Sequence, residues 1–500
     1  MNELTGDPLA ADTVDVIVIG GGAVGENAAD YAVRGGLSTV VIESELLGGE
    51  CSYWACMPSK ALLRTPHAVA AARRLPGVRA EFDPSAVLAR RDSFTSHWSD
   101  DGQVQWARDA GIAVLRGRAR LAGERAVQVG DRLLRARHAV VICTGSVPVK
   151  PPIPGLDTVR TWNTRDATSA KTVPGRLAVL GGGPVGVELG QAFARLGSTV
   201  TLLETGPRVL SRFEPMVGER LVEALRADGV DVRLNTELAE VAPSEEAAHP
   251  KEAAHPKETA ESERAIALRY RDGRTVVVDE LLVAAGRRPA TSDLGLESVA
   301  LNPVGELQPG GPLRVDDSGL VCGVAGQWLY AAGDVTDRAP LTHQGKYAAR
   351  IVGAAIAARA RGHEVDPEPW SEHAASADHV AVPLVVFTDP EVAAVGRTQR
   401  QATDAGLDVR CVEVELAVAG SALHADGYSG AARMVVDQHR GVLVGATFIG
   451  QDVAELLHAA TVAIVGEVPL ERLWHAVPAY PTISEVWLRL LEAYRACPKA

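Results

Sequence analysis

A chain of 500 residues is too long for one hydrophobic core, so we expect roughly two to four domains. The apolar fraction of 46% and the charged fraction of 23% are typical of a globular protein. A formal net charge of −13, without any long basic run, argues against nucleic acid as a partner. Because the N-terminus is acidic and no apolar run reaches about 18 residues, we expect a cytoplasmic protein without a membrane span.

The stretch VDVIVIGGGAVGENAADYAVRGGLSTVVIES, from residue 14 to residue 44, predicts a strand, a glycine turn, a helix and a second strand. Gly20, Gly22 and Gly25 fit the G-x-G-x-x-G pattern of dinucleotide-binding folds. The first glycine permits the tight turn, the second lets the backbone approach a pyrophosphate, and the third allows close packing of helix on strand. Glu43 ends the second strand, where a carboxylate can accept hydrogen bonds from ribose hydroxyls.

The same pattern recurs in RLAVLGGGPVGVELGQAFARLGSTVTLLET, in which Gly181, Gly183 and Gly186 form the turn and Glu204 ends the second strand. Two dinucleotide sites in one chain indicate electron transfer between two cofactors. The carboxylate of Glu204 would repel a ribose 2′-phosphate, and Arg208 nearby does not replace it, so NADH is expected in preference to NADPH.

Two later regions have a different character. Residues 242–263 contain EAAHPK twice, and this polar, Pro-interrupted composition predicts a solvated loop. Its His249 and His255 leave a metal-binding patch as the alternative.

From about residue 370, apolar strands separated by turns and followed by amphipathic helices predict a mixed α+β domain.

Cys51 and Cys56 stand five positions apart in GGECSYWACMPSK. Such a pair in a reducing compartment is more typical of a catalytic or metal site than of a structural disulfide. Zinc would need about four ligands, and no second Cys or His pair with suitable spacing is near. Positions five apart on one regular helix are beyond disulfide reach, so we expect Cys51 in a distorted first turn or the preceding loop. Gly48 and Gly49 would let this turn approach a cofactor closely.

From residue 14 to about residue 492 the chain resembles the FAD-dependent pyridine nucleotide-disulfide oxidoreductases. The resemblance is carried by the two glycine turns, GGECSYWACMPSK, VVICTGSVPVKPPIPG and LYAAGDV, together with LLVAAGRRPAT and VVFTDPEVAAVG. The usual Asn after Arg-Arg-Pro is Ala290 here. The resemblance implies an α/β fold with an FAD-binding Rossmann-like domain, an inserted NAD-binding Rossmann-like domain and an α+β dimer-interface domain. The corresponding bounds are 1–165 and 295–367 for the FAD domain, 166–294 for the NAD domain and 368–500 for the interface domain.

The resemblance also assigns the cofactor-binding residues. Asp334 would hold the FAD ribityl chain, and Lys60 would lie under the flavin with its charge paired with Glu188. The full FAD set is Gly20, Gly22, Gly25, Glu43, Gly49, Lys60, Thr144, Gly145 and Asp334. The NAD(P)H set is Gly181, Gly183, Gly186, Glu188, Glu204 and Gly286.

The implied reaction passes electrons from NADH through FAD to a Cys51–Cys56 disulfide and on to a disulfide-type acceptor, as in dihydrolipoamide dehydrogenase. Cys56 would be the charge-transfer thiolate and Cys51 the interchange thiol. Tyr53 and Trp54, between the cysteines, could narrow the pocket, stack on a flat acceptor or simply pack. A non-catalytic flavoprotein that reports redox state to a partner is the alternative from a different class.

One motif departs from the family. A partner-chain His in a His-Pro-Thr-x-Ser-Glu context usually serves the interchange thiol, but this chain reads HAVPAYPTISEVW, with Tyr480 at the His position and Glu485 at the Glu position. A phenol titrates near 10 rather than near 6.5, so it exchanges protons poorly at neutral pH. His475 could substitute as the base, although a hydrogen-bonded structural histidine is the favoured interpretation, and Cys497 could serve a partner's site, although a mobile terminal thiol is the default interpretation.

We therefore expect a homodimer in which Tyr480 and Glu485 reach the partner chain's disulfide, with no resident metal. The acceptor could be a small-molecule disulfide, or, in mercuric-reductase-like or quinone-reductase-like chemistry, a metal ion or a quinone.

Overall fold

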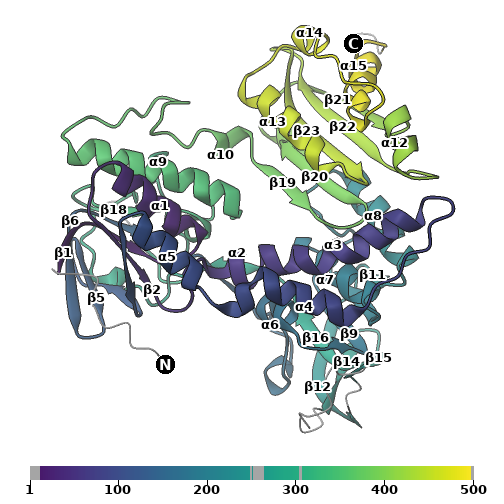
Figure 1. Cartoon of the computed structure of the whole chain (residues 1–500), viewed down its shortest axis with the longest axis horizontal. Coiled ribbons are helices and arrows are strands. Elements are labelled where there is room, and N and C mark those ends of the chain that lie inside the picture. The colour runs from purple at the N-terminus through teal and green to yellow at the C-terminus, as the bar shows by residue number, and fades with distance from the viewer. Residues whose placement is uncertain (1–11, 248–249, 252–263, 303–306, 497–500) are drawn as a thin grey trace. The chain divides into compact units, whose positions relative to one another are not determined.

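The computed structural model describes residues 12–247, 250–251, 264–302 and 307–496 (Figure 1). The chain divides into two compact units, each assembled from three separate stretches of sequence. The first unit consists of Met1–Met57, Thr95–Val149 and Arg287–His379. The second unit consists of Pro58–Phe94, Lys150–Gly286 and Val380–Ala500.

The first unit is built on a sheet with the strand order β3-β2-β1-β6-β5-β4, in which β18 also pairs with β6. The long strand β6 runs parallel to β1 and β18 near its end and antiparallel to β5 near its start. Runs such as Val-Ile-Val-Ile in β1 are buried on both sides, as expected for a parallel sheet covered on both faces. The strands are β1 (Thr13–Ile19), β2 (Thr39–Glu43), β3 (Ile112–Arg116), β4 (Ala119–Leu121), β5 (Ala126–Val129), β6 (Arg132–Ile142) and β18 (Leu329–Ala331).

Helices α1 (Ala23–Arg34) and α9 (Thr342–Ala360) lie side by side on this sheet (Figure 1). A Cβ added at Gly353 of α9 would lie 2.5 Å from the Cβ of Tyr31 in α1, so the close approach requires glycine. The other elements of this unit are α2 (Gly49–Tyr53), η1 (Ser96–Trp98), α5 (Asp101–Asp109), β7 (Ser146–Pro148), β17 (Arg287–Pro289), η3 (Leu296–Ser298) and η4 (Asp334–Thr336). Helix α10 (Ala377–Val380) stands at the boundary of the two units.

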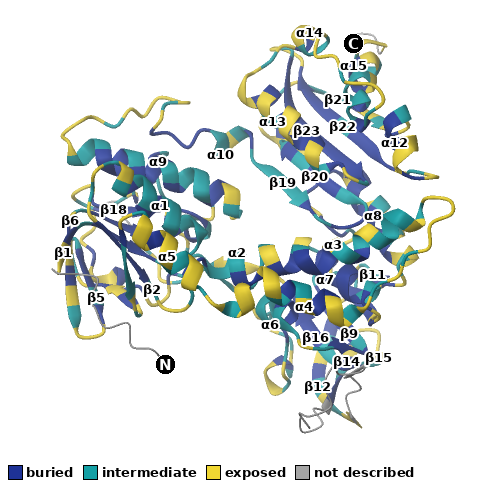
Figure 2. Cartoon of the chain, viewed as in Figure 1, coloured by how far each residue is buried: buried dark blue, intermediate teal, exposed yellow. Residues whose placement is uncertain are grey.

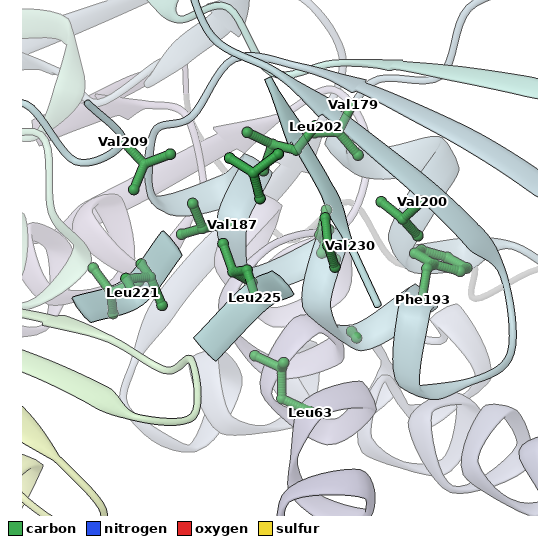
Figure 3. Packing of buried hydrophobic residues seen from close by; sticks show 14 of the residues in the cluster. Leu63, Val179, Val187, Phe193, Val200, Leu202, Val209, Leu221, Leu225 and Val230 are labelled. Atoms are coloured by element: carbon green, nitrogen blue, oxygen red, sulfur yellow. The ribbon is translucent and has the colours of Figure 1, made fainter. Parts of the chain in front are cut away.

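The second unit contains a parallel sheet of order β11-β10-β9-β16. Its core gathers apolar side chains from several helices, among them Leu63, Phe193 and Leu225 (Figure 3). The strands are β9 (Arg176–Leu180), β10 (Thr199–Leu203), β11 (Asp231–Arg233) and β16 (Glu280–Val283). The helices are α3 (Cys56–Arg73, of which the first two residues belong to the first unit), α4 (Pro84–Phe94), η2 (Leu156–Thr158), α6 (Thr164–Ser169), α7 (Pro184–Arg195) and α8 (Pro215–Ala227).

The low-complexity segment is not a loop throughout, which corrects the expectation for residues 242–263. Strand β12 (Leu238–Ala247) extends into it and pairs antiparallel with β14 (Arg264–Tyr270), which pairs in turn with β15 (Thr275–Val278). Pro250–Lys251 form β13 and pair with β8 (Val173–Pro174). The partner strand β14 buries Ile266, Leu268 and Tyr270, and this apolar strand favours pairing over the local polar composition. His249 and His255 lie outside the described residues.

The last part of the second unit is an antiparallel sheet of order β19-β20-β23-β22-β21. Strand β23 is buried at every position, and β22 is nearly so (Figure 2). The strands are β19 (Pro383–Val386), β20 (Glu391–Gly396), β21 (Val409–Glu415), β22 (Ala431–Asp437) and β23 (Val442–Gly450). The helices are α11 (Gln399–Asp404), α12 (Ala419–His424), η5 (Ala454–Leu456), α13 (Leu457–Val465), α14 (Leu470–Leu473), η6 (Ile483–Glu485) and α15 (Val486–Ala496).

This architecture confirms the expected α/β class: each unit has a sheet with a parallel core in which a glycine turn joins a strand to a helix, and the second unit also has an antiparallel sheet with helices. Within the described residues, no helix is both long and apolar enough to cross a membrane.

Candidate redox and nucleotide sites

The first glycine turn joins β1 to α1 and has the geometry that its sequence predicts. Gly20 adopts a φ of +98°, and a Cβ there would lie 2.5 Å from the carbonyl oxygen of Cys143. A Cβ on Gly25 would lie 1.9 Å from the carbonyl oxygen of Gly20, so the first and third glycines are required by the fold. The second turn repeats both restrictions, with Gly181 and Gly186 in the same positions.

The middle glycine of each turn is different, because the protein around it leaves room for a side chain. A Cβ at Gly22 would meet only the Cα of Gly49, at 3.9 Å, and a Cβ at Gly183 would meet no heavy atom of the described residues within 4 Å. Neither glycine has a φ that L-residues avoid. A glycine that neither packing nor backbone geometry requires fits the close approach of a pyrophosphate to a helix N-terminus, as in FAD and NAD(P)H.

The acidic residue at the end of the second strand is fixed in the same way in both turns. Glu43 Oε2 accepts a hydrogen bond from Gly21 N at 2.7 Å, and Glu204 Oε2 accepts one from Gly182 N at 2.7 Å. Gly206 N donates to the second oxygen of Glu204, also at 2.7 Å. Each carboxylate is therefore held against its glycine turn, with lone pairs left for a ribose.

The two cysteines belong to the first unit and lie on successive helices. Cys51 is in the short helix α2, which is capped by Trp54, whose backbone N–H donates to Glu50 O. Cys56 is the first residue of α3. The expectation that one regular helix cannot carry both is confirmed, although Cys51 occupies a separate helix rather than a loop. Both side chains are half-buried.

The double glycine places α2 directly against the first glycine turn. Gly48 N donates to Gly21 O at 2.7 Å, and a Cβ on Gly49 would lie 2.7 Å from the Cα of Gly22. Gly48 and Gly49 have φ values of +107° and +62°, which favour glycine. Helix α2, which carries Cys51, is thus packed directly against the first glycine turn.

Thr342, the first residue of α9, lies next to Cys56. Its Oγ1 is 3.4 Å from Cys56 Sγ, close enough for a hydrogen bond to sulfur. When the sulfur is a thiolate, a hydroxyl donor stabilises its charge. The sequence separation is 286 residues, and no local pattern pointed to this contact.

A chain of hydrogen bonds surrounds Asp334, which opens η4. Ser146 Oγ donates to Asp334 Oδ2 at 2.6 Å, while Arg287 donates to Ser146 through Nε and Nη2, at 2.8 Å to the hydroxyl and 2.6 Å to the carbonyl. Arg287 Nη2 also lies 3.7 Å from a carboxylate oxygen of Glu50, the residue before Cys51. Neither Ser146 nor Arg287 was among the predicted site residues.

Thr144 and Gly145 follow β6 after Cys143, and both are hydrogen-bonded to the segment that follows β17. Thr144 Oγ1 donates to Ala290 O at 2.9 Å, and Ala290 N donates to Gly145 O at 2.9 Å. Ala290 takes part through its backbone, so the loss of the usual Asn leaves these bonds in place. Gly286 ends the middle stretch of the second unit with a φ of +122°, in open surroundings among the described residues.

Lys60 and Glu188 form the expected ion pair within the second unit. Lys60 Nζ lies 2.7 Å from Glu188 Oε2, and the side chain of Glu188 is only 5% exposed. Glu188 Oε1 accepts from Phe387 N at 2.8 Å, and the Lys60 ammonium lies 4.9 Å from the centre of the Phe387 ring. The Glu188 carboxylate therefore holds both Lys60 and the start of the segment that follows β19.

Tyr480 and Glu485 belong to the second unit, whereas Cys51 and Cys56 belong to the first. Tyr480 is 77% exposed and precedes Pro481 through a cis peptide bond. Glu485 is bound by Arg489 through one carboxylate oxygen, and the other oxygen is buried without a hydrogen-bond partner among the described residues. His475 is exposed, and Cys497 lies outside the described residues.

Tyr53 packs in the core rather than lining an open pocket. It is 3% exposed, its hydroxyl donates to Ser99 O at 3.3 Å, and its ring meets that of Trp54 edge to face. Burial, together with the nearby Asp100 and Glu26, raises the pKa of Tyr53 to about 12. Trp54 is half-buried. Of the three roles considered for this pair, packing is the one that Tyr53 fulfils.

Among the described residues, no group of three or more His, Cys, Asp or Glu side chains is placed to hold a metal ion.

Comparison with known proteins identifies the family. Residues 14–362 match the pyridine nucleotide-disulphide oxidoreductase family, and residues 382–491 match its dimerisation domain. A dihydrolipoyl dehydrogenase from Chlorobaculum tepidum is 33% identical over 491 residues, covering 96% of this chain and 96% of that protein. A mercuric reductase from Shigella flexneri is 31% identical over 500 residues, covering 97% of this chain and 81% of that protein.

Solved structures agree on the fold. LpdA from Mycobacterium tuberculosis superposes with a TM-score of 0.76 at 25% identity, covering 96% of this chain and 99% of that one. The HOCl-induced flavoprotein disulfide reductase RclA from Escherichia coli gives a TM-score of 0.77 at 24% identity, which supports the fold alone.

The enzymes of this family bind FAD and use NAD(P)H, and the two glycine turns described above fit both groups. They are disulfide oxidoreductases of the dihydrolipoyl dehydrogenase and mercuric reductase type. The chain belongs to the pyridine nucleotide-disulphide oxidoreductase family.

Proposed function

We propose that this enzyme passes electrons from NADH to a Cys51–Cys56 disulfide and from there to a disulfide-type acceptor. The observation that carries the proposal is the packing of the cysteine segment against the first glycine turn. The double glycine before Cys51 is hydrogen-bonded to that turn, and Cys56 meets Thr342 at the start of α9. The bound FAD would accept a hydride from NAD(P)H and deliver an electron pair to the disulfide.

The protein's own groups would hold the resulting thiolate and its proton. Cys56 stands at the N-terminus of α3, where the exposed backbone amides favour negative charge on sulfur. The Thr342 hydroxyl adds a hydrogen bond to the same sulfur. Cys56 would therefore remain as the stabilised thiolate, while Cys51 would be left to attack the acceptor.

The FAD side of the site would be fixed by Asp334 and Lys60. Asp334 is oriented by the hydroxyl of Ser146, which leaves its other carboxylate oxygen for a ribityl hydroxyl. Lys60 is held by Glu188 and would supply positive charge near the flavin. Thr144 and Gly145 would line the crossing into the nucleotide-binding segment that follows.

NADH would be preferred to NADPH at the second glycine turn. Both oxygens of Glu204 accept backbone hydrogen bonds, which hold the side chain in place, and a 2′-phosphate would be repelled by the acidic group at this position. Gly181, Gly183, Gly186 and Gly286 would form the rest of this site.

The enzyme would act as a homodimer, with Tyr480 and Glu485 serving the partner chain's disulfide. The dimerisation segment leaves large apolar side chains exposed in and after α13, including Val462 at 53% and Val477 at 85%. Tyr480 is exposed next to this surface in sequence and is free to enter another subunit.

The tyrosine favours a second candidate activity, the reduction of a quinone or a metal ion. A phenol can donate a hydrogen bond but exchanges its proton slowly at neutral pH, so it serves a disulfide acceptor less well than a histidine. Acceptors that need no proton shuttle at the interchange thiol would be affected least.

Anaerobic titration with NADH tests the main proposal. Uptake of four electrons per subunit, with a long-wavelength thiolate band that disappears in Cys56→Ser, is the expected result. Failure of NADH to reduce the protein would instead support a non-catalytic flavoprotein. Steady-state NADH oxidation with lipoamide, glutathione-like disulfides, Hg²⁺ and quinones then distinguishes the acceptors, and NADPH in the same assay tests the nucleotide preference.

A further inference from the structure

Glu26 lies in the first helical turn of α1 and directly follows Gly25, the third glycine of the first glycine turn. One oxygen of its carboxyl group, Oε1, is buried and has no hydrogen-bond partner in the described part of the chain. A buried polar atom without a partner is costly in a folded protein, so it calls for an explanation.

The second glycine turn shows that the fold itself does not need a carboxyl group here. Both turns have the same spacing, and the residue after Gly186 is Val187, which is fully buried in the apolar core. The same helix position thus takes an aliphatic side chain in one turn and an acid in the other. The acidic residue in the first glycine turn is therefore not required by the packing of the helix and needs another explanation.

The charged groups facing Glu26 come from each element around it. Glu43 of β2 disfavours its ionisation, Lys346 of α9 favours it, and Tyr53 of α2 is itself neutral until high pH. Desolvation is the largest effect and raises the pKa of Glu26 to about 7. The side chain thus carries its proton over much of the range below neutral pH.

We propose that Glu26 binds the FAD pyrophosphate as a neutral carboxylic acid that donates a hydrogen bond to a phosphate oxygen. A neutral acid supplies one donor, whereas a carboxylate can only accept and would repel the two phosphate charges. FAD affinity would then depend on one proton held beside the glycine turn. The inference rests on the proposed binding of FAD at that turn.

The direction of the pH dependence follows from linkage. FAD favours the protonated form, so the pKa of Glu26 is higher in the complex than in the protein alone. Binding is therefore strongest below the lower of these two pKa values and weakens as the pH rises through the interval between them. A single coupled proton gives about a tenfold loss of affinity per pH unit in that interval.

The test measures flavin release from the diluted holoenzyme by FAD fluorescence, at constant ionic strength from pH 5.5 to 9. The wild type is expected to lose affinity as the pH rises from about neutral, by about tenfold per pH unit. Glu26→Gln keeps a donor without a titration, so it should retain FAD with a flat profile. Glu26→Val, the residue of the second turn, should bind more weakly at pH 6 and also show a flat profile.

Asp30→Asn is the matched control, because Asp30 lies one turn later on α1 and pairs with Arg34 at 2.8 Å. It should keep the wild-type profile. Binding that tightens with pH in the wild type and weakens in Glu26→Gln would mean a carboxylate accepting from a ribose hydroxyl, and would overturn the inference. A flat wild-type profile with FAD bound overturns the inference alone, whereas a wild type that binds no FAD overturns the proposed function as well.

Discussion

The hydroxyl of Thr342 lies 3.4 Å from the sulfur of Cys56, so the start of α9 contacts the residue that begins α3. Thr342→Val keeps the shape and removes the donor to a thiolate, a loss of roughly 1.5 kcal/mol. The long-wavelength band of the reduced enzyme should then develop about one pH unit higher. A pH titration of that band checks the shift. Thr342→Ser retains the hydroxyl and should behave as the wild type; equal profiles for Val and wild type would remove Thr342 from the site.

Tyr480→His replaces a phenol with a group that titrates near neutral pH. If slow proton exchange limits disulfide reduction, NADH-dependent lipoamide turnover should rise by about tenfold or more. Quinone reduction, which does not use this proton, should change little. Tyr480→Phe serves as the control for bulk, and an unchanged lipoamide rate in Tyr480→His would shift the cause to the shape of the pocket.

Removing the partner of Lys60 should weaken the second unit. Glu188→Ala deprives both the Lys60 ammonium and Phe387 N of their acceptor, and a carboxylate this well buried contributes about 2–3 kcal/mol. Lys60→Met should also cost about 2–3 kcal/mol, because it leaves the Glu188 carboxylate, which is 5% exposed, without its counter-ion. Urea unfolding curves give both values. The double variant should be more stable than the sum of the single losses predicts, and simple additivity would mean that the pair is not coupled.

Arg287→Gln should weaken FAD binding by roughly tenfold at neutral pH, because Ser146 loses two hydrogen bonds and no longer fixes Asp334. Flavin release from the diluted holoenzyme measures the change. Arg288→Gln, at the next position of β17, is the control, since the hydrogen bond of Arg288 within the described residues goes to Ser292 on the surface. Equal retention in the two variants would contradict a role for Arg287 in orienting Asp334.

His67 should make the protein less stable in acid. Burial and the nearby Arg195 lower the pKa of His67 from 6.5 to about 4. Because the folded protein holds the neutral ring, the contribution is complete above pH 6.5 and is lost as the pH falls towards 4, at most about 3 kcal/mol. Urea midpoints measured from pH 7 to 4 should fall less steeply in His67→Gln. The same slope in both proteins would show that other groups control the acid transition.

The glycine turns and their acidic residues could be predicted because their chemistry is local. Gly20, Gly25 and Glu43 lie within 24 residues of one another, and the strand and helix between them fix their geometry. The prediction that Cys51 and Cys56 do not share one regular helix was local too, because it followed from the distance between helical positions five residues apart. The pairing of Lys60 with Glu188 needed the resemblance to a family, since nothing local links the two.

The contacts that were missed depend on tertiary structure. Thr342 reaches Cys56, and Arg287 reaches Ser146, only after distant segments have come together. The sequence left the role of Tyr53 undecided between lining a pocket and packing in the core. Its burial depends on contacts with Trp98 and Ser99, which are separated from it in sequence by two helices. Strand β12 overrode a polar composition because β14 offered a pairing edge.

Gly22 and Gly183 have a practical consequence for mutational surveys. The surrounding chain would tolerate a methyl group at either position, so an alanine variant should fold normally and melt at the usual temperature without cofactor. A screen that scores folding alone would therefore class these two glycines as neutral. Only a screen that scores cofactor loading would reveal them, which separates the residues selected for folding from those selected for chemistry.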